Sequence, residues 1–132
     1  MFLGLLKEEE KNAFLELAHY LARSDGDFSD KQKEIISTYC FEMNIDDIDY
    51  NAEKFDLNYT LSKFLSEKSK KIVLLEVMAL IYSDEYIHLE EQKIIDIMLE
   101  KFELNNTISN IYLEWTKTIL AVSEQGKLLL EL

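Results

Sequence analysis

The sequence predicts an all-α fold, a single domain over residues 1–132 built from two repeated helical hairpins. The composition is the first reason, because the 132 residues include no Pro and only three Gly, the residues that most often interrupt helices. Apolar residues also recur at the three- and four-residue spacing of amphipathic helices. In addition, residues 21–28 return as residues 80–87, 59 positions later (80 − 21). Such a repeat predicts a duplicated supersecondary unit.

The first predicted hairpin joins two helices through an acidic elbow. Helical spacing of apolar residues predicts a helix over about residues 7–24. Its buried face carries Phe14, Leu17, Ala18, Leu21 and Ala22. A second helix is expected after Ser29, which with Gln32 has the spacing of a capping box, and it should end at Asn44.

The middle of the chain begins with an acidic stretch over residues 45–64, where we expect one or two short helices. Ser66 then has the position of an N-cap for a helix over about residues 67–83. From Ile72 to Tyr82 this helix is apolar on nearly every side apart from Glu76, which predicts that it is the central helix of the bundle. The residues expected to be buried together are Val77, Met78, Leu80, Ile81, Ile95 and Met98.

Two further helices are predicted over about residues 90–102 and 107–123. The last of them carries its apolar residues on one stripe, with Gly126 as the expected stop. That stripe consists of Ile108, Ile111, Tyr112, Trp115 and Ile119. The alignment of the two repeats continues beyond the elbows, so the hairpins should cover about residues 14–45 and 73–104.

The net charge limits which kinds of partner the protein can bind. Twenty-six acidic against fourteen basic residues give a formal charge of −12, which disfavours nucleic acid and anionic membranes because both require basic side chains. No apolar run is long enough to span a bilayer, so we expect no membrane insertion, a cytoplasmic location and a protein partner.

The single cysteine, Cys40, lies on a helical apolar stripe and is interpreted as a buried, inert thiol.

The elbows carry a family resemblance. Residues 24–29 read Ser-Asp-Gly-Asp-Phe-Ser, and the second elbow has Ser83 and Asp84 with Glu91 seven residues after the aspartate. A small residue before Asp-Gly at the end of a helix, then a serine cap, duplicated within the chain, resembles the TerB-like family known from tellurite resistance proteins. The chain departs from the family pattern at Gln32, where the family has Glu, and at Glu85, where it has Gly.

The resemblance implies a bundle of about seven to eight helices. It also implies a non-enzymatic accessory or stress-response protein with a weak divalent-cation site at the acidic elbows. The residues to which it transfers are Asp25, Asp27, Asp84 and Glu91. Oxygen ligands of this kind suit hard cations such as Ca²⁺ or Mg²⁺, although Ca²⁺ takes six to eight of them. A structural alternative is that the aspartates stabilise the loops by accepting backbone N–H bonds, with Gly26 providing a positive φ.

Two other functions remain open from the sequence. One is a metal-free helical adaptor whose acidic surface binds a basic protein partner. The other is a di-iron oxidoreductase, because Glu16 with His19 and Glu85 with His88 both have the Glu-x-x-His spacing of di-iron bundles. The second pair straddles an elbow, which argues against this site, and we interpret His19 as a surface histidine. Because the sequence has no Gly-rich phosphate loop and no nucleophile elbow, a non-enzyme is expected.

Overall fold

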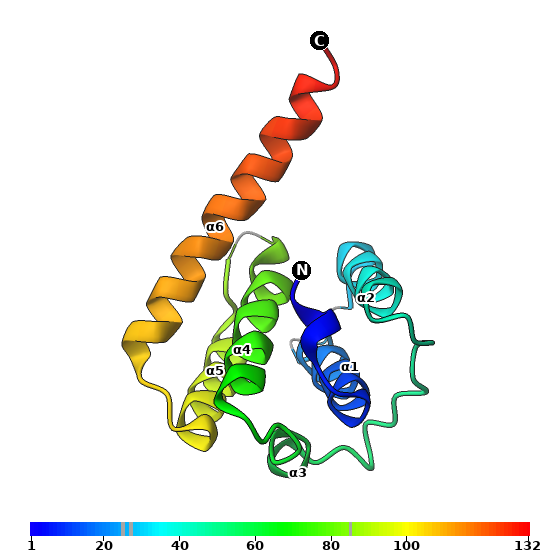
Figure 1. Ribbon diagram of the computed structural model, residues 1–132, viewed down its shortest axis with the longest axis vertical. Coiled ribbons are helices and arrows are strands. Elements are labelled where there is room, and N and C mark those ends of the chain that lie inside the picture. The colour runs from blue at the N-terminus through cyan, green and yellow to red at the C-terminus, as the bar shows by residue number, and fades with distance from the viewer. Residues whose placement is uncertain (25, 27, 85) are drawn as a thin grey trace.

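The computed structural model describes residues 1–24, 26, 28–84 and 86–132, with Asp84 described by its backbone alone. Within these residues the chain is entirely helical, without strands (Figure 1). The α-helices are α1 (Glu8–Ala22), α2 (Asp30–Met43), α3 (Leu57–Leu61), α4 (Glu67–Ile81), α5 (Leu89–Phe102) and α6 (Asn106–Leu129). Two short 3₁₀ turns, η1 (Leu3–Leu5) and η2 (Tyr82–Asp84), accompany them. The described residues thus form six α-helices, and the expected seven to eight is not confirmed.

The bounds of the first two long helices recur in the second pair. α1 begins at Glu8 and α4 at Glu67, a difference of 59 (67 − 8), and the ends of both helices keep this offset. The bounds of α2 and α5 keep it as well (89 − 30). The repeat offset seen in the sequence therefore also separates the helix boundaries.

Local signals set these boundaries. Ser29 Oγ accepts a hydrogen bond from Gln32 N at 3.1 Å, and the Gln32 side chain accepts one from Ser29 N at 3.2 Å, which is the predicted capping box. Ser66 Oγ accepts a bond from Ser69 N at 3.0 Å at the start of α4, also as predicted. α2 ends where Asn44 enters the left-handed region with φ 55°. Asn tolerates this conformation better than most residues.

The central position predicted for α4 is confirmed, since it packs against α1, α5, α6 and η1. All six residues predicted to form the common core are buried: Val77, Met78, Leu80, Ile81, Ile95 and Met98. Cys40 is buried in the same core, as expected. Only one short helix, α3, forms in the acidic stretch between α2 and α4.

The predicted end of the last helix is wrong. α6 continues through Gly126 to Leu129, and its C-terminal half projects beyond the other helices (Figure 1). A glycine inside an exposed helix costs about 1 kcal/mol relative to Ala, which does not force the helix to end. None of the helices in the described part of the chain is both long and apolar enough to cross a membrane.

Candidate functional site

The acidic elbows fall largely outside the described residues. Asp25 and Asp27 are not described, and the side chain of Asp84 is not described either, so the site predicted there stays a prediction. Gly26 has φ 82°, the positive value expected of it. Glu91, the fourth predicted ligand, is only 1 % exposed, and its Oε1 accepts a hydrogen bond from His88 N at 3.0 Å. This carboxylate therefore stabilises the first turn of α5.

Outside the elbows, the part of the chain that the structure describes offers no metal centre. Among the described residues, no group of three or more His, Cys, Asp or Glu side chains could hold a metal ion. The two residues of the first Glu-x-x-His motif do not share a site either, because Glu16 contacts Thr60 whereas His19 contacts Asp47. Glu85 of the second motif lies outside the described residues, and His88 is the N-cap of α5.

His19 is buried, with 5 % of its surface exposed, so its interpretation as a surface histidine is wrong. Its Nε2 lies 2.9 Å from Asp47 Oδ1, and its Nδ1 lies 3.4 Å from Arg23 Nη2. Because a guanidinium can only donate, a hydrogen bond from Arg23 makes Nδ1 the acceptor, and Nε2 is then the donor to the Asp47 carboxylate. Asp47 also accepts from Ile48 N at 2.8 Å, so one carboxylate fixes the start of the segment 44–56 on α1.

Aromatic rings enclose this histidine. The His19 ring stacks on Tyr50 at 5.5 Å between centroids, and Phe28 meets it edge-on at 6.0 Å. The Arg23 guanidinium lies 4.3 Å from the centroid of Phe28 and 5.3 Å from that of Tyr50. Stacking and cation–π contacts together hold the segment 44–56 against α1. Burial, with Asp47 nearby, raises the pKa of the Cys40 thiol, so this cysteine is a poor nucleophile.

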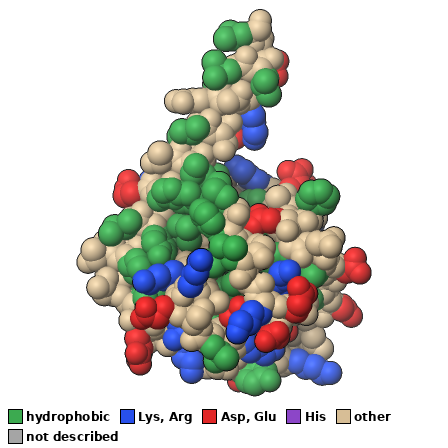
Figure 2. All heavy atoms as spheres, viewed as in Figure 1, with side chains coloured by type: hydrophobic (Ala, Val, Ile, Leu, Met, Phe, Trp, Pro, Cys, Tyr) green, Lys and Arg blue, Asp and Glu red, His purple; other side chains and the backbone are tan. Residues whose placement is uncertain are grey.

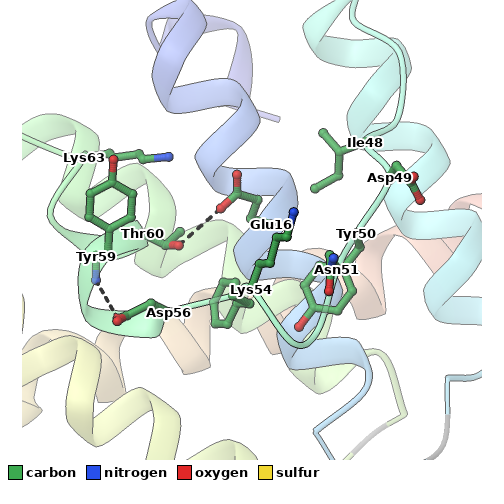
Figure 3. A pocket seen from close by; sticks show the side chains of 11 residues that line it. Glu16, Ile48, Asp49, Tyr50, Asn51, Lys54, Asp56, Tyr59, Thr60 and Lys63 are labelled. Carbon is green, nitrogen blue, oxygen red and sulfur yellow. Dashed lines mark hydrogen bonds between the residues drawn. The ribbon is translucent and has the colours of Figure 1, made fainter.

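A polar hollow of about 280 Å³ lies on the other side of Tyr50 (Figure 3). In it Glu16 Oε2 accepts a hydrogen bond from the Thr60 hydroxyl at 3.3 Å. Lys63 Nζ lies 4.9 Å from the centroid of the Tyr59 ring. The described lining residues include acids, lysines and aromatic rings, which are groups that bind polar ligands.

The first residues form a strap across the bundle. The Met1 amino group lies 2.6 Å from Glu42 Oε1 and 2.9 Å from Glu76 Oε1. Phe2 N donates to Glu76 at 2.8 Å, and Leu3 N donates to Glu42 at 2.8 Å. Burial alone would lower the pKa of the amino group, but the two carboxylates outweigh it and raise this pKa. These contacts satisfy Glu76, the one acidic residue within the apolar part of α4.

The most prominent surface feature is an apolar row along α6, which we call the α6 face: Ile111, Trp115, Val122 and Leu129. Ile111, Val122 and Leu129 are 59 %, 55 % and 67 % exposed. Their spacings of 11 and 7 residues place them on one side of a helix with 3.6 residues per turn. Trp115 is half-buried, its ring centroid 6.1 Å from that of Phe2. Figure 2 shows hydrophobic side chains gathered where α6 leaves the bundle. Ile111 belongs to the apolar stripe predicted for this helix, and it is exposed.

An open hollow of about 500 Å³, here called the Lys71 hollow, lies beside the α6 face. Its lining residues are Phe2, Glu67, Lys68, Lys71, Ile72, Leu75 and Tyr112. Neither Lys68 nor Lys71 forms an ion pair with any acidic side chain in the described ranges. Two cations therefore lie at the edge of an apolar surface in a strongly acidic protein.

Comparison with protein families, with characterised proteins and with solved structures finds no match to this chain. What the structure itself defines is an all-α domain that carries an exposed apolar helix face.

Proposed function

We propose that this protein is a non-enzymatic interaction module and that the α6 face is its binding surface. The observation that carries the proposal is the row of exposed apolar side chains at Ile111, Val122 and Leu129. Contiguous apolar surface on a soluble protein commonly marks a site of protein association. The face itself carries little charge, so the partner would be recognised by apolar contact and not through the acidic surface of the bundle.

The second half of α6 has few contacts with the rest of the described chain, and this favours the same function. The residues of α6 that are fully buried, Ser109 and Thr116, both lie in its first half. Helical segments shorter than about 12 to 15 residues are marginal in water without tertiary contacts. A partner that covers the projecting half would supply those contacts.

The test is photo-crosslinking in cells. A photoreactive amino acid placed at Val122 should give a discrete protein adduct on irradiation. The matched control is Phe41, which is 89 % exposed on α2 and lies outside the α6 face, and it should give none. Equal or absent adducts at the two positions would contradict the proposal.

A second candidate function is weak binding of Ca²⁺ or Mg²⁺ at the two elbows, in keeping with the TerB-like resemblance. The matched bounds of α1–α2 and α4–α5 favour it, because they give the two elbows equivalent places in two similar hairpins. If the hairpins pack as pseudo-symmetric halves, the elbows share one surface where like charges repel and a cation relieves the repulsion.

Thermal denaturation distinguishes this candidate. At a hundredfold excess over the dissociation constant, an ion stabilises the fold by about 2.7 kcal/mol. Millimolar Ca²⁺ should then raise Tm, and Asp25→Asn and Asp84→Asn should each reduce the increase. Equal Tm values in chelator and in millimolar cation would exclude the cation site without touching the α6 proposal.

A further inference from the structure

We propose that Arg23 and the hollow beside it form a binding site for a small monocarboxylate with an apolar body. The hollow, here called the Arg23 hollow, is lined by described residues from the end of α1, the segment 44–56 and α5, and by none from α6. The inference therefore goes beyond the proposed function, and either one can be wrong without the other.

Arg23 is the only arginine in the sequence, and its side chain is exposed at the end of α1. None of the ion pairs between described residues includes Arg23, although the chain has 26 acidic residues. Its Nη2 lies 3.4 Å from His19 Nδ1. A guanidinium has five N–H donors and keeps its charge at every physiological pH. Arg23 therefore has donors left for an anion.

The guanidinium is held in place before any ligand binds. It lies 4.3 Å from the ring centroid of Phe28 and 5.3 Å from that of Tyr50, which are distances of cation–π attraction. The contact with His19, which is itself buried, restrains the same group. A side chain that is already ordered loses less conformational entropy on binding. Arg23 is therefore well suited to recognise an anion.

The Arg23 hollow has room for an apolar group next to the guanidinium. Its volume is about 470 Å³, within the range of roughly 300 to 1,000 Å³ that small-molecule sites have. The Tyr20 ring, which forms part of the wall, stacks on Phe55 with 4.4 Å between the ring centroids. The aromatic and aliphatic residues of the described lining are Tyr20, Tyr50, Ile94 and Ile97. A ligand with an anionic end and an apolar body would contact both parts of this site.

The charges around the hollow favour a carboxylate over a phosphate. A carboxylate carries one charge, and its two oxygens can accept two parallel N–H bonds from one guanidinium. A phosphate ester carries about two charges at neutral pH. Lys93, the other described cation of the lining, already pairs with Glu90, since its Nζ lies 3.1 Å from Glu90 Oε1. In a chain with a net charge of −12, the second charge of a phosphate would be repelled and not compensated.

The equivalent helix pair shows that the fold does not require an arginine at this place. Tyr82 is the equivalent of Arg23 (82 − 23 = 59), and α1 and α4 nevertheless both have 15 residues. Ala79 is the equivalent of Tyr20 (79 − 20 = 59). The second pair thus has neither the guanidinium nor the ring that define the site. This difference favours a role in binding for Arg23.

NMR titration of the wild-type protein tests the site. As the only arginine, Arg23 gives the only arginine Nε–H signal in proton–nitrogen correlation spectra, so this signal reports directly on the guanidinium. The probe is benzoate, and the matched control is benzamide, which has a similar shape but no charge. Benzoate should shift the Arg23 Nε–H signal and the Ile97 methyl signals along one saturable curve, whereas benzamide should not. Equal shifts with both compounds, or no saturable shift with benzoate, would overturn the inference.

Two variants and one control measure the contributions of the guanidinium and the apolar wall. Arg23→Gln should weaken benzoate binding by about tenfold or more, since hydrogen bonds to a charged group contribute about that factor. Lys101→Gln removes the same charge from an exposed position of α5 outside the described lining, and it should leave the affinity unchanged. Ile97→Ala, at a side chain that is 40 % exposed, should weaken binding without unfolding the protein. Unchanged affinity in Arg23→Gln or in Ile97→Ala would overturn the inference, as would tighter binding of phenyl phosphate than of benzoate by the wild type.

Discussion

The helix pairs α1–α2 and α4–α5, which the sequence predicts to be repeated hairpins, have boundaries that recur 59 residues apart, but their surroundings differ. α1–α2 and α4–α5 each comprise a 15-residue and a 14-residue helix, and each pair ends at a residue with positive φ, Asn44 or Glu103. The segment 44–56 covers α1 through aromatic contacts, whereas α6 packs against α4. Local signals therefore set where the helices begin and end, whereas the packing of each hairpin depends on the next segment of the chain.

Equivalent core positions test whether the two hairpins share one core. Leu21 and Leu80 are 59 residues apart (80 − 21) and both are buried. Leu21→Ala and Leu80→Ala should each lower the free energy of unfolding by about 2 to 5 kcal/mol, the range for large-to-small core changes. Urea denaturation measures this, with Ile97→Ala at a largely exposed site as the control. A large loss at one leucine only would show that the hairpins unfold separately.

His19 and Met78 occupy equivalent positions (78 − 19 = 59) and can be exchanged. Met78→His should destabilise by about 2 kcal/mol, because it buries an imidazole where position 106, the equivalent of Asp47, holds Asn. His19→Met removes the bond to Asp47 but keeps an apolar side chain, so about 1 kcal/mol should be lost. Chemical denaturation of both variants checks the order. A more harmful His19→Met would mean that the Asp47 contact matters more than its half-exposed carboxylate suggests.

Tyr39 makes the first hairpin sensitive to alkaline pH. Burial, with Glu76 and Glu42, raises the pKa of its phenol well above the ordinary 10.0. Below pH 10 the hydroxyl keeps its proton in both states and adds no pH dependence. Above pH 10 only the unfolded state ionises, so unfolding becomes easier by up to about 1.4 kcal/mol per pH unit.

The measurement is urea denaturation between pH 8 and pH 11. Tyr39→Phe should flatten the fall in stability above pH 10, although at neutral pH it loses about 1 kcal/mol with the hydrogen bond to the Glu76 carbonyl. Tyr59→Phe, at an exposed ring, should leave the slope unchanged. The equivalent position in the second hairpin is Met98, which does not titrate. An unchanged slope in Tyr39→Phe would place the alkaline sensitivity elsewhere.

Substitutions at the C-terminal ends of α2 and α5 give the smallest expected change in stability. Asn44 has φ 55° and Glu103 has φ 57°, and glutamate adopts this conformation less readily than asparagine. Glu103→Asn should therefore stabilise the fold by about 0.5 to 1 kcal/mol. Asn44→Glu should destabilise it by a similar amount. If the Tm values of both variants shift in the same direction, side-chain contacts and not backbone conformation determine the stability of these helix ends.

Much of the fold could be predicted because its signals are local. Ser29, Ser66 and Asn44 mark helix ends through bonds to residues within four positions, and the apolar run around Met78 could only be central. The surroundings of His19 could not be predicted, since Asp47 and Tyr50 cover it from a segment with no periodic pattern. A burial signal was present, however, because Leu15 and Ala22 lie one turn away on either side and are themselves buried.

The candidate sites were harder to predict. Of the predicted cation ligands, only the Glu91 side chain lies among the described residues, so Asp25, Asp27 and Asp84 stay predictions. The α6 face was missed because an apolar stripe at helical spacing has the same pattern whether it faces a core or a partner. Ile111 fits such a stripe, yet it is exposed although Ser109 and Thr116, two and five residues away on the helix, are buried.

The strap formed by the first three residues has a consequence for synthesis. Its backbone N–H groups are bound by Glu42 and Glu76, the second of which lies 74 residues after Phe2 (76 − 2). Because a ribosome adds about 5 to 20 residues per second, Glu76 is made roughly 4 to 15 s after the residues of the strap. The strap can therefore close fully only after α4 has been made, so its closure depends on a helix that follows it by more than 60 residues (67 − 3 = 64).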